Sequence, residues 1–226
     1  MQRLSKLLAT AALVLVAATH AYAQEKIRLA ASTQSIGYTP VYAAEAMGYF
    51  KELGLTVERI KASSGPQALS ALISGDFDIV TGNSANIPNI RKNGGDVISF
   101  AALLPQYGGD IVATKAWAAK MNITGKSPYK DKLQIFKGAT IGVTGAGGGS
   151  DQITRFLARE GGLNPDRDMT IVSIPDPAAM QAAFVAGRID IMAQSAPTSA
   201  IAVQSGGVMI LNLGIGEVPE IGRAHV

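Results

Sequence analysis

A glycine-rich run at residues 145–150, GAGGGS, is the stretch of this sequence best suited to contacting a small ligand. Glycine lets the backbone approach a bound group closely, and the free N–H groups at the start of a helix attract an anion. The run follows a predicted strand over 140–144 and opens a predicted helix, so we expect it to hold an oxyanion. A purely structural glycine turn is one alternative. A dinucleotide-binding loop is another, but Ser150 stands where that motif needs its third glycine.

Polar residues follow three further predicted strands. In an open parallel sheet, ligands bind beyond the carboxyl ends of the strands, where helices begin. Turn formation and helix capping are alternative roles for several of these residues, since Ser, Thr and Asn are common in both. The predicted ligand-binding residues are Gln34, Tyr38 and Thr39 in the first loop, Asn83 and Ser84 in the second, Gly148, Gly149 and Ser150 in the third, and Gln194 and Ser195 in the fourth.

Side chains that usually carry catalysis are missing from the body of the chain. The sequence has no cysteine, and its two histidines, His20 and His225, lie at the extreme ends. A thiol nucleophile, a disulfide, a Cys-based metal site and a histidine base are therefore excluded, and no H-E-x-x-H or G-x-S-x-G motif occurs. We predict no catalytic residue, no metal and no cofactor. The protein is expected to bind rather than to catalyse.

The orientation of two carboxylate side chains affects whether this site can bind an anion. Asp151 and Asp176 begin predicted helices, where a carboxylate interacts favourably with the positive end of the helix dipole. Either side chain would disfavour an anionic ligand if it turned into the site, and the sequence does not say which way they point.

The amino terminus has the layout of a secretory signal peptide. Arg3 and Lys6 precede an apolar run over residues 7–18, and small residues flank Tyr22 before Gln24. About 12 apolar residues are too few to cross a hydrocarbon core of roughly 30 Å. We predict cleavage after residue 23 and a periplasmic mature protein. Losing two cations lowers the formal net charge from +3 to +1, and the sequence lacks a basic run, so no nucleic-acid partner is expected.

Strands and helices alternate along the chain, which predicts an α/β fold with mainly parallel sheets. In the first half we expect strands over 27–32, 56–60, 77–80 and 97–103, and a helix over 37–53. A shift of 112 residues superposes these elements on a second set, which indicates two similar lobes. The predicted division is 24–108 for lobe one, 109–138 for a hinge strand and connector, and 139–219 for lobe two.

Residues 220–226, EIGRAHV, resemble an in-frame translation of a sequencing adapter and are expected to be a non-native tail. On this hypothesis the natural protein continues beyond the residues given, and lobe two is incomplete.

Three segments carry a resemblance to a known family. They are residues 37–58 (GYTPVYAAEAMGYFKELGLTVE), 75–79 (GDFDI) and 136–143 (FKGATIGV). These resemble the NMT1/THI5-like solute-binding proteins of ABC importers, a group that includes nitrate, taurine, alkanesulfonate and thiamine-precursor binders. The pyrimidine synthases of the same family carry a Cys-rich motif and an active-site histidine, and their absence here excludes that enzymatic role.

The resemblance implies the type II periplasmic binding protein fold, with two lobes joined by two crossovers. The second crossover and the carboxyl-terminal helices of that fold are missing from this sequence. The implied function is extracytoplasmic binding of a small anionic or polar solute between the lobes, followed by delivery to an inner-membrane ABC permease by a monomer. An extracytoplasmic ligand-sensing module of a signalling system is the alternative.

Overall fold

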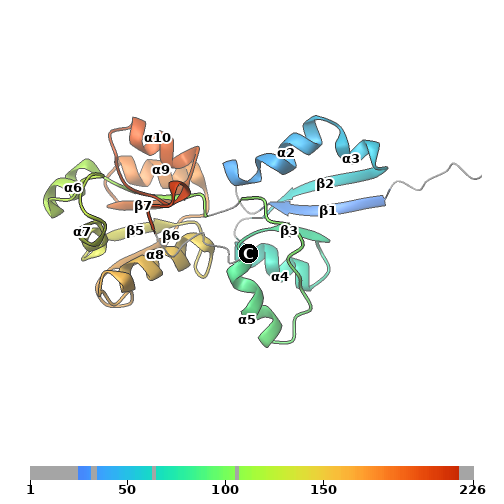
Figure 1. Ribbon diagram of the computed structural model, residues 1–226, viewed down its shortest axis with the longest axis horizontal. Coiled ribbons are helices and arrows are strands. Elements are labelled where there is room, and N and C mark those ends of the chain that lie inside the picture. Colours follow the sequence, from blue (N-terminus) through green and yellow to red (C-terminus); the bar gives the residue numbers. More distant parts are fainter. Residues whose placement is uncertain (1–24, 32–34, 63–64, 105–106, 219–226) are drawn as a thin grey trace, which may run out of the picture.

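The computed structural model describes residues 25–31, 35–62, 65–104 and 107–218, which form two α/β lobes side by side (Figure 1). The predicted fold class is confirmed. Gln34 and the predicted signal peptide and tail lie outside the described residues. No helix in the described part of the chain is long and apolar enough to cross a membrane.

Lobe two is built on a five-stranded sheet of order β6-β5-β7-β4-β8. Strands β5, β6 and β7 run parallel to one another, whereas β4 runs antiparallel between β7 and β8. The strands are β4 (Gly109–Ala113), β5 (Thr140–Val143), β6 (Thr170–Ser173), β7 (Ile191–Ser195) and β8 (Val208–Asn212). The sequence predicted a hinge strand at the start of 109–138 that leaves lobe one; residues 109–113 do form a strand, but it is an inner strand of the lobe-two sheet.

Helices cover both faces of this sheet, and side chains of β4 alternate between two cores. Ile111 packs in a cluster with helices α6 and α8, while its neighbour Val112 packs in a second cluster with α9 and α10. This alternation follows from the two-residue period of a strand. The helices of lobe two are α6 (Lys115–Met121), α7 (Tyr129–Lys132), η4 (Leu133–Phe136), α8 (Gly149–Glu160), α9 (Pro177–Val185), α10 (Thr198–Gln204) and η5 (Leu213–Ile215).

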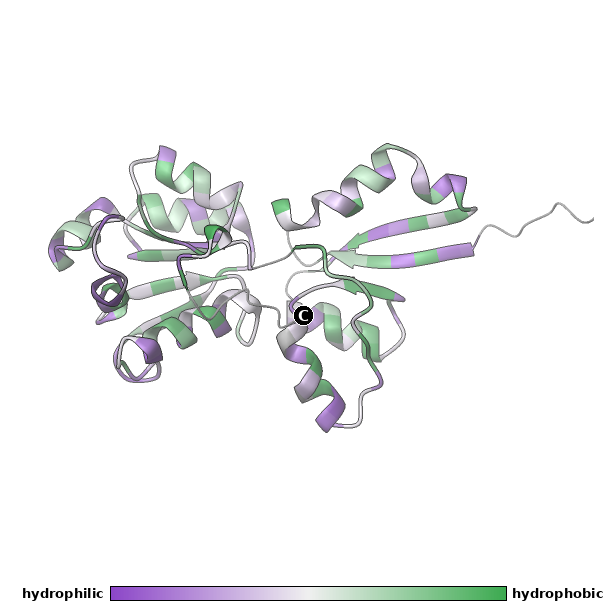
Figure 2. Ribbon diagram, in the orientation of Figure 1, coloured by the Kyte–Doolittle hydropathy of each residue, from purple (hydrophilic) through white to green (hydrophobic). Residues whose placement is uncertain are grey.

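Lobe one has a smaller sheet of order β2-β1-β3, in which both β2 and β3 run parallel to β1. Its strands mix hydrophilic and hydrophobic residues, whereas hydrophobic residues dominate the strands of lobe two (Figure 2). Its elements are β1 (Glu25–Ala31), η2 (Ile36–Tyr38), α2 (Thr39–Ala46), α3 (Tyr49–Glu52), β2 (Leu55–Lys61), α4 (Gly65–Ile73), β3 (Ile79–Thr81), η3 (Ser84–Asn86) and α5 (Ile87–Lys92).

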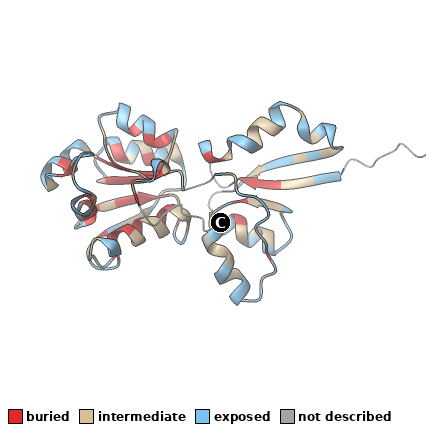
Figure 3. Ribbon diagram, viewed as in Figure 1, coloured by how far each residue is buried: buried red, intermediate tan, exposed pale blue. Residues whose placement is uncertain are grey.

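Packing is much lighter in lobe one. Its buried apolar cluster consists of Ala30, Ala62 and Ala68, whereas the larger cluster of lobe two has twenty buried members. Buried positions are accordingly concentrated in lobe two (Figure 3).

Two expectations for lobe one are wrong. The predicted helix over 37–53 is divided into η2, α2 and α3, and Gly48 between α2 and α3 has a left-handed φ of 79° that no continuous helix allows. The predicted strand over 97–103 does not form, and Ile98 and Phe100 in it are 69% and 71% exposed. A strand needs a neighbour for its backbone hydrogen bonds. Its counterpart β8 in lobe two pairs with β4, and the described part of lobe one has no equivalent of β4.

The 112-residue repeat recurs in specific hydrogen bonds. The Asp78 carboxylate accepts the backbone N–H of Arg28 in β1 at 2.7 Å, and the Asp190 carboxylate accepts that of Thr140 in β5 at 2.8 Å. In both lobes the N–H of the aspartate also donates to the carbonyl of the same strand residue. These aspartates fix the first strand to the third at the end remote from the predicted ligand loops.

Candidate functional site

Side chains of the glycine-rich loop between β5 and α8 accept hydrogen bonds from the loop's own backbone. The Ser150 hydroxyl accepts the N–H of Thr144 at 3.0 Å, and the Asp151 carboxylate accepts the N–H of Gly147 at 2.7 Å. Both side chains are buried inside the loop, so Ser150 can offer only its backbone N–H to a ligand. The N-cap of α8 is Gly148, which has no side chain to satisfy the first turn. Within the described residues, the N–H groups of Gly149 and Ser150 meet no protein acceptor.

Neither carboxylate at a predicted helix start is turned into the site. Asp151 binds Arg155 through a 2.8 Å ion pair within α8, in addition to the loop N–H. Asp176 caps α9 by accepting the N–H of Ala179 at 2.8 Å. Both carboxylates thus serve their own helices.

Residues of lobe one reach the start of α8. A Cβ placed on Gly149 would lie 3.1 Å from the Asn83 side-chain nitrogen and 3.4 Å from both the ring and the hydroxyl of Tyr107. Glycine is therefore needed here for the close approach of the two lobes. Gly148 faces lobe one as well, since its Cβ would lie 3.8 Å from Pro66.

A second set of contacts joins the lobes at the end of β7. The Ser195 hydroxyl donates to the Ser35 hydroxyl at 3.0 Å, and the N–H of Ile36 donates to the carbonyl of Ala196 at 3.1 Å. The Ala196–Pro197 peptide bond that follows is cis. A third contact links α8 to η3, where Gln152 donates to the Asn86 side chain at 2.6 Å.

Tyr38 belongs to the same junction. It ends η2, and its phenol is close enough to that of Tyr107 to help raise the pKa of Tyr107, after burial as the main cause. Asp110 is the third contributor. The Asp110 carboxylate accepts the Ser199 hydroxyl at 2.5 Å, and burial raises its own pKa, against the opposing effect of this hydrogen bond.

The remaining predicted residues are less favourably placed. Thr39 is exposed and donates to the carbonyl of Ile36, as a turn residue does. Ser84 is exposed at the start of η3. Gln194 is buried in β7, where its amide oxygen accepts the N–H of Ser195. Of the predicted residues, the structure brings five to the junction between the lobes: Tyr38, Asn83, Gly148, Gly149 and Ser195.

The residues of the junction that were not predicted include Ser35, Asn86, Tyr107 and Gln152. Tyr107 had a usable sequence signal, because it lies two residues before the start of the predicted hinge strand at 109. Ser35, Asn86 and Gln152 are ordinary polar residues of turns and helices, and only the meeting of the lobes distinguishes them.

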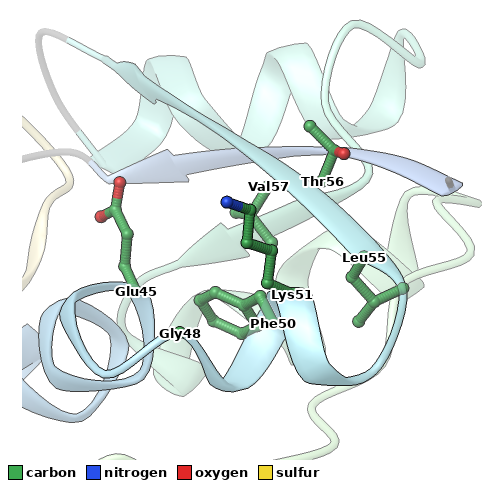
Figure 4. A pocket seen from close by; sticks show the side chains of 7 residues that line it. All are labelled: Glu45, Gly48, Phe50, Lys51, Leu55, Thr56 and Val57. Atoms are coloured by element: carbon green, nitrogen blue, oxygen red, sulfur yellow. The ribbon is translucent and has the colours of Figure 1, made fainter.

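An open pocket elsewhere in lobe one contains none of the predicted residues. It lies between helices α2 and α3 and the start of β2, with Glu45, Lys51 and Phe50 in its lining (Figure 4). Glu45 is already bound there by Arg59 at 3.2 Å. In the part of the chain that the structure describes, no cluster of His, Cys, Asp or Glu suited to a metal ion is found.

Comparison with known proteins assigns the class. Residues 21–214 match the NMT1-like family, and the chain belongs to that family. Similar folds are those of periplasmic binding proteins of type II, and the structural neighbours include an aliphatic sulphonate-binding and a nitrate-binding protein.

Individual relatives are longer than this chain. A putative binding protein, YtlA, of Bacillus subtilis (strain 168) is 27% identical over 199 residues, which cover 86% of this chain and 56% of that protein. A structure from Bordetella bronchiseptica RB50 has a TM-score of 0.68 and 26% identity, covering 83% of this chain and 56% of that one. The periplasmic aliphatic sulphonate binding protein SsuA of Escherichia coli has a TM-score of 0.51 and 23% identity, covering 82% and 60%. The chain thus spans little more than half the length of these proteins.

Proposed function

We propose that this protein is the solute-binding component of an ABC importer and that it binds a small anionic or polar solute where its lobes meet. The single observation that carries the proposal is the approach of Asn83 in lobe one to Gly149 at the start of α8 in lobe two. The family assignment supports the class of function.

The chemistry of this junction suits an acceptor-rich solute. Helix α8 is twelve residues long, and its dipole places partial positive charge at Gly149 and Ser150, whose N–H groups have no acceptor in the described structure. The side-chain amide of Asn83 adds a donor from the opposite lobe. A sulfonate, nitrate or thiamine-precursor-like solute would present the matching oxygen or nitrogen acceptors.

Delivery to a permease requires a closed state that the solute stabilises. A solute bonded to both Gly149 and Asn83 gains both sets of contacts only when the lobes are together, so it shifts the population toward closure. In this proposal lobe one is residues 24–108, lobe two is residues 109–219 because β4 and the helices over 115–136 pack in its sheet and core, and residues 1–23 direct export to the periplasm. Gln34, outside the described residues, and Tyr38 complete the lobe-one side of the site.

Thermal unfolding with added solutes tests the proposal. The purified protein is melted with sodium nitrate, sodium methanesulfonate, taurine or an aminopyrimidine, and with choline chloride as a cationic control. A binding solute raises the melting temperature progressively with concentration. At one hundred times its Kd it stabilises the folded protein by about 2.7 kcal/mol. The proposal would be overturned if none of the four solutes raised the melting temperature more than choline chloride does.

A further inference from the structure

Tyr107 is the side chain that fills the junction between the two lobes. It directly precedes Gly108 and Gly109, at the point where the chain passes into lobe two. A Cβ on Gly109 would overlap the Tyr107 ring, and a Cβ on Gly149 would touch its far edge and its hydroxyl at 3.4 Å. The absence of side chains at both glycines leaves a slot between β4 and the first turn of α8, and the ring lies in it.

The Tyr107 hydroxyl is turned toward the polar groups proposed for the solute. A Cβ placed on Gly149 would lie 3.4 Å from the Tyr107 hydroxyl and 3.1 Å from the Asn83 side-chain nitrogen, so both groups lie beside the start of α8. No hydrogen-bond partner of this hydroxyl is found among the described residues. Tyr107 is half-buried, so a ligand or water can reach this hydroxyl and accept its hydrogen bond.

The charge state of this phenol is suited to donation. Burial is the main cause that raises the pKa of Tyr107 above its ordinary value, and Tyr38 and Asp110 raise it further. The phenol therefore keeps its proton throughout the physiological range and can donate a hydrogen bond to an anion.

We propose that Tyr107 is the specificity-determining residue of the solute site: its hydroxyl donates to the solute, and its ring limits the solute's size. The inference rests on the proposed function, because it assigns a role within that same site. A solute that reaches the N–H groups of Gly149 and Ser150 must pass the Tyr107 ring, since the ring lies against that turn.

Two substitutions separate the roles of the hydroxyl and the ring. Tyr107→Phe removes only the hydroxyl, and Tyr107→Ala also removes the ring. The matched control is Tyr49→Phe, since Tyr49 lies in α3 of lobe one, 46% exposed and remote from the junction (Figure 1). Binding is measured by isothermal titration calorimetry with nitrate and with alkanesulfonates of one to eight carbons, and near-ultraviolet circular dichroism verifies folding.

The parent protein and the control should bind alike. Tyr107→Phe should weaken binding of every bound anion roughly ten-fold to a hundred-fold, as expected for loss of a hydrogen bond to a charged acceptor. Tyr107→Ala should shift the preference toward longer alkanesulfonates.

Wild-type affinity in Tyr107→Phe, with no change of chain-length preference in Tyr107→Ala, would overturn the inference and leave the proposed function standing. A parent protein that binds none of these anions would instead overturn both. If Tyr107→Ala does not fold, the Tyr107→Phe titration decides the matter by itself.

Discussion

Gln152 of α8 and Asn86 of η3 are joined by a 2.6 Å hydrogen bond that spans the two lobes. The same Gln152 amide also donates to the carbonyl of Gly147 in the glycine-rich loop at 2.9 Å. One side chain thus connects the loop that begins α8, the helix itself and the opposite lobe. Any change in how far apart the lobes lie must break or re-form this bond.

Gln152→Ala should loosen the junction. Loss of this hydrogen bond is expected to cost about 0.5–1.5 kcal/mol of lobe–lobe association and to open the molecule. Small-angle X-ray scattering should record a larger radius of gyration. Gln134→Ala is the matched control, because Gln134 donates to the carbonyl of Gly161 within lobe two. Equal radii for the two variants would contradict the prediction.

Gly149→Ala should impair closure without weakening α8. Gly149 is the first residue of this helix, where alanine is readily accommodated, but the added Cβ would lie 3.1 Å from Asn83. We expect at least about a ten-fold loss of affinity for a bound solute, equivalent to 1.4 kcal/mol, and an unchanged melting temperature without solute. Gly65→Ala at the start of α4 is the control, because nothing lies within 4 Å of its Cβ. Parental solute affinity in Gly149→Ala would show that the lobes need not approach at this residue.

Asp78 should contribute stability that is lost in acid. The Arg28 side chain donates to this carboxylate, and with the Arg28 backbone N–H it lowers the pKa of Asp78 from 3.8 to about 2. Because the folded pKa lies below the unfolded one, the stabilisation is fully present above pH 4 and disappears as the pH falls toward 2.

The measurement is urea unfolding of the parent and of Asp78→Asn from pH 2 to pH 6. The difference in unfolding free energy should be largest at pH 6 and should fall to a small remainder at pH 2. Asp131→Asn is the control, since this exposed residue of α7 makes no ion pair among the described residues. A difference that does not change with pH would refute the role of the Asp78 carboxylate.

Lobe one should open before lobe two. Each buried large aliphatic side chain stabilises a fold by roughly 1.5–3 kcal/mol, and the buried cluster of lobe one consists of three alanines. Hydrogen exchange followed by mass spectrometry should find amides of β1 to β3 exchanging at least about ten-fold faster than those of β4, β5 and β7. Equal protection in the two sheets would mean that the lobes unfold as one unit.

Much of the fold could be predicted because its signals are local. The caps, the glycines at helix ends and the apolar strand centres placed most helices and strands, and a constant spacing of 112 residues revealed the repeat later seen in the bonds of Asp78 and Asp190. The strand over 97–103 could not be predicted correctly, because an apolar alternating segment becomes a strand only where another strand pairs with it.

For the candidate site too, local features could be predicted from the sequence and contacts between distant residues could not. The sequence by itself determined which loops end strands, that α8 begins with glycines, and that the body of the chain lacks cysteine and histidine. Only the tertiary structure decided that the Ser150 and Asp151 side chains turn back into their own loop and that Tyr107 lies against Gly149. Local propensities depend on neighbours in the sequence. Which side chains face one another across two lobes depends on contacts between residues far apart in the chain.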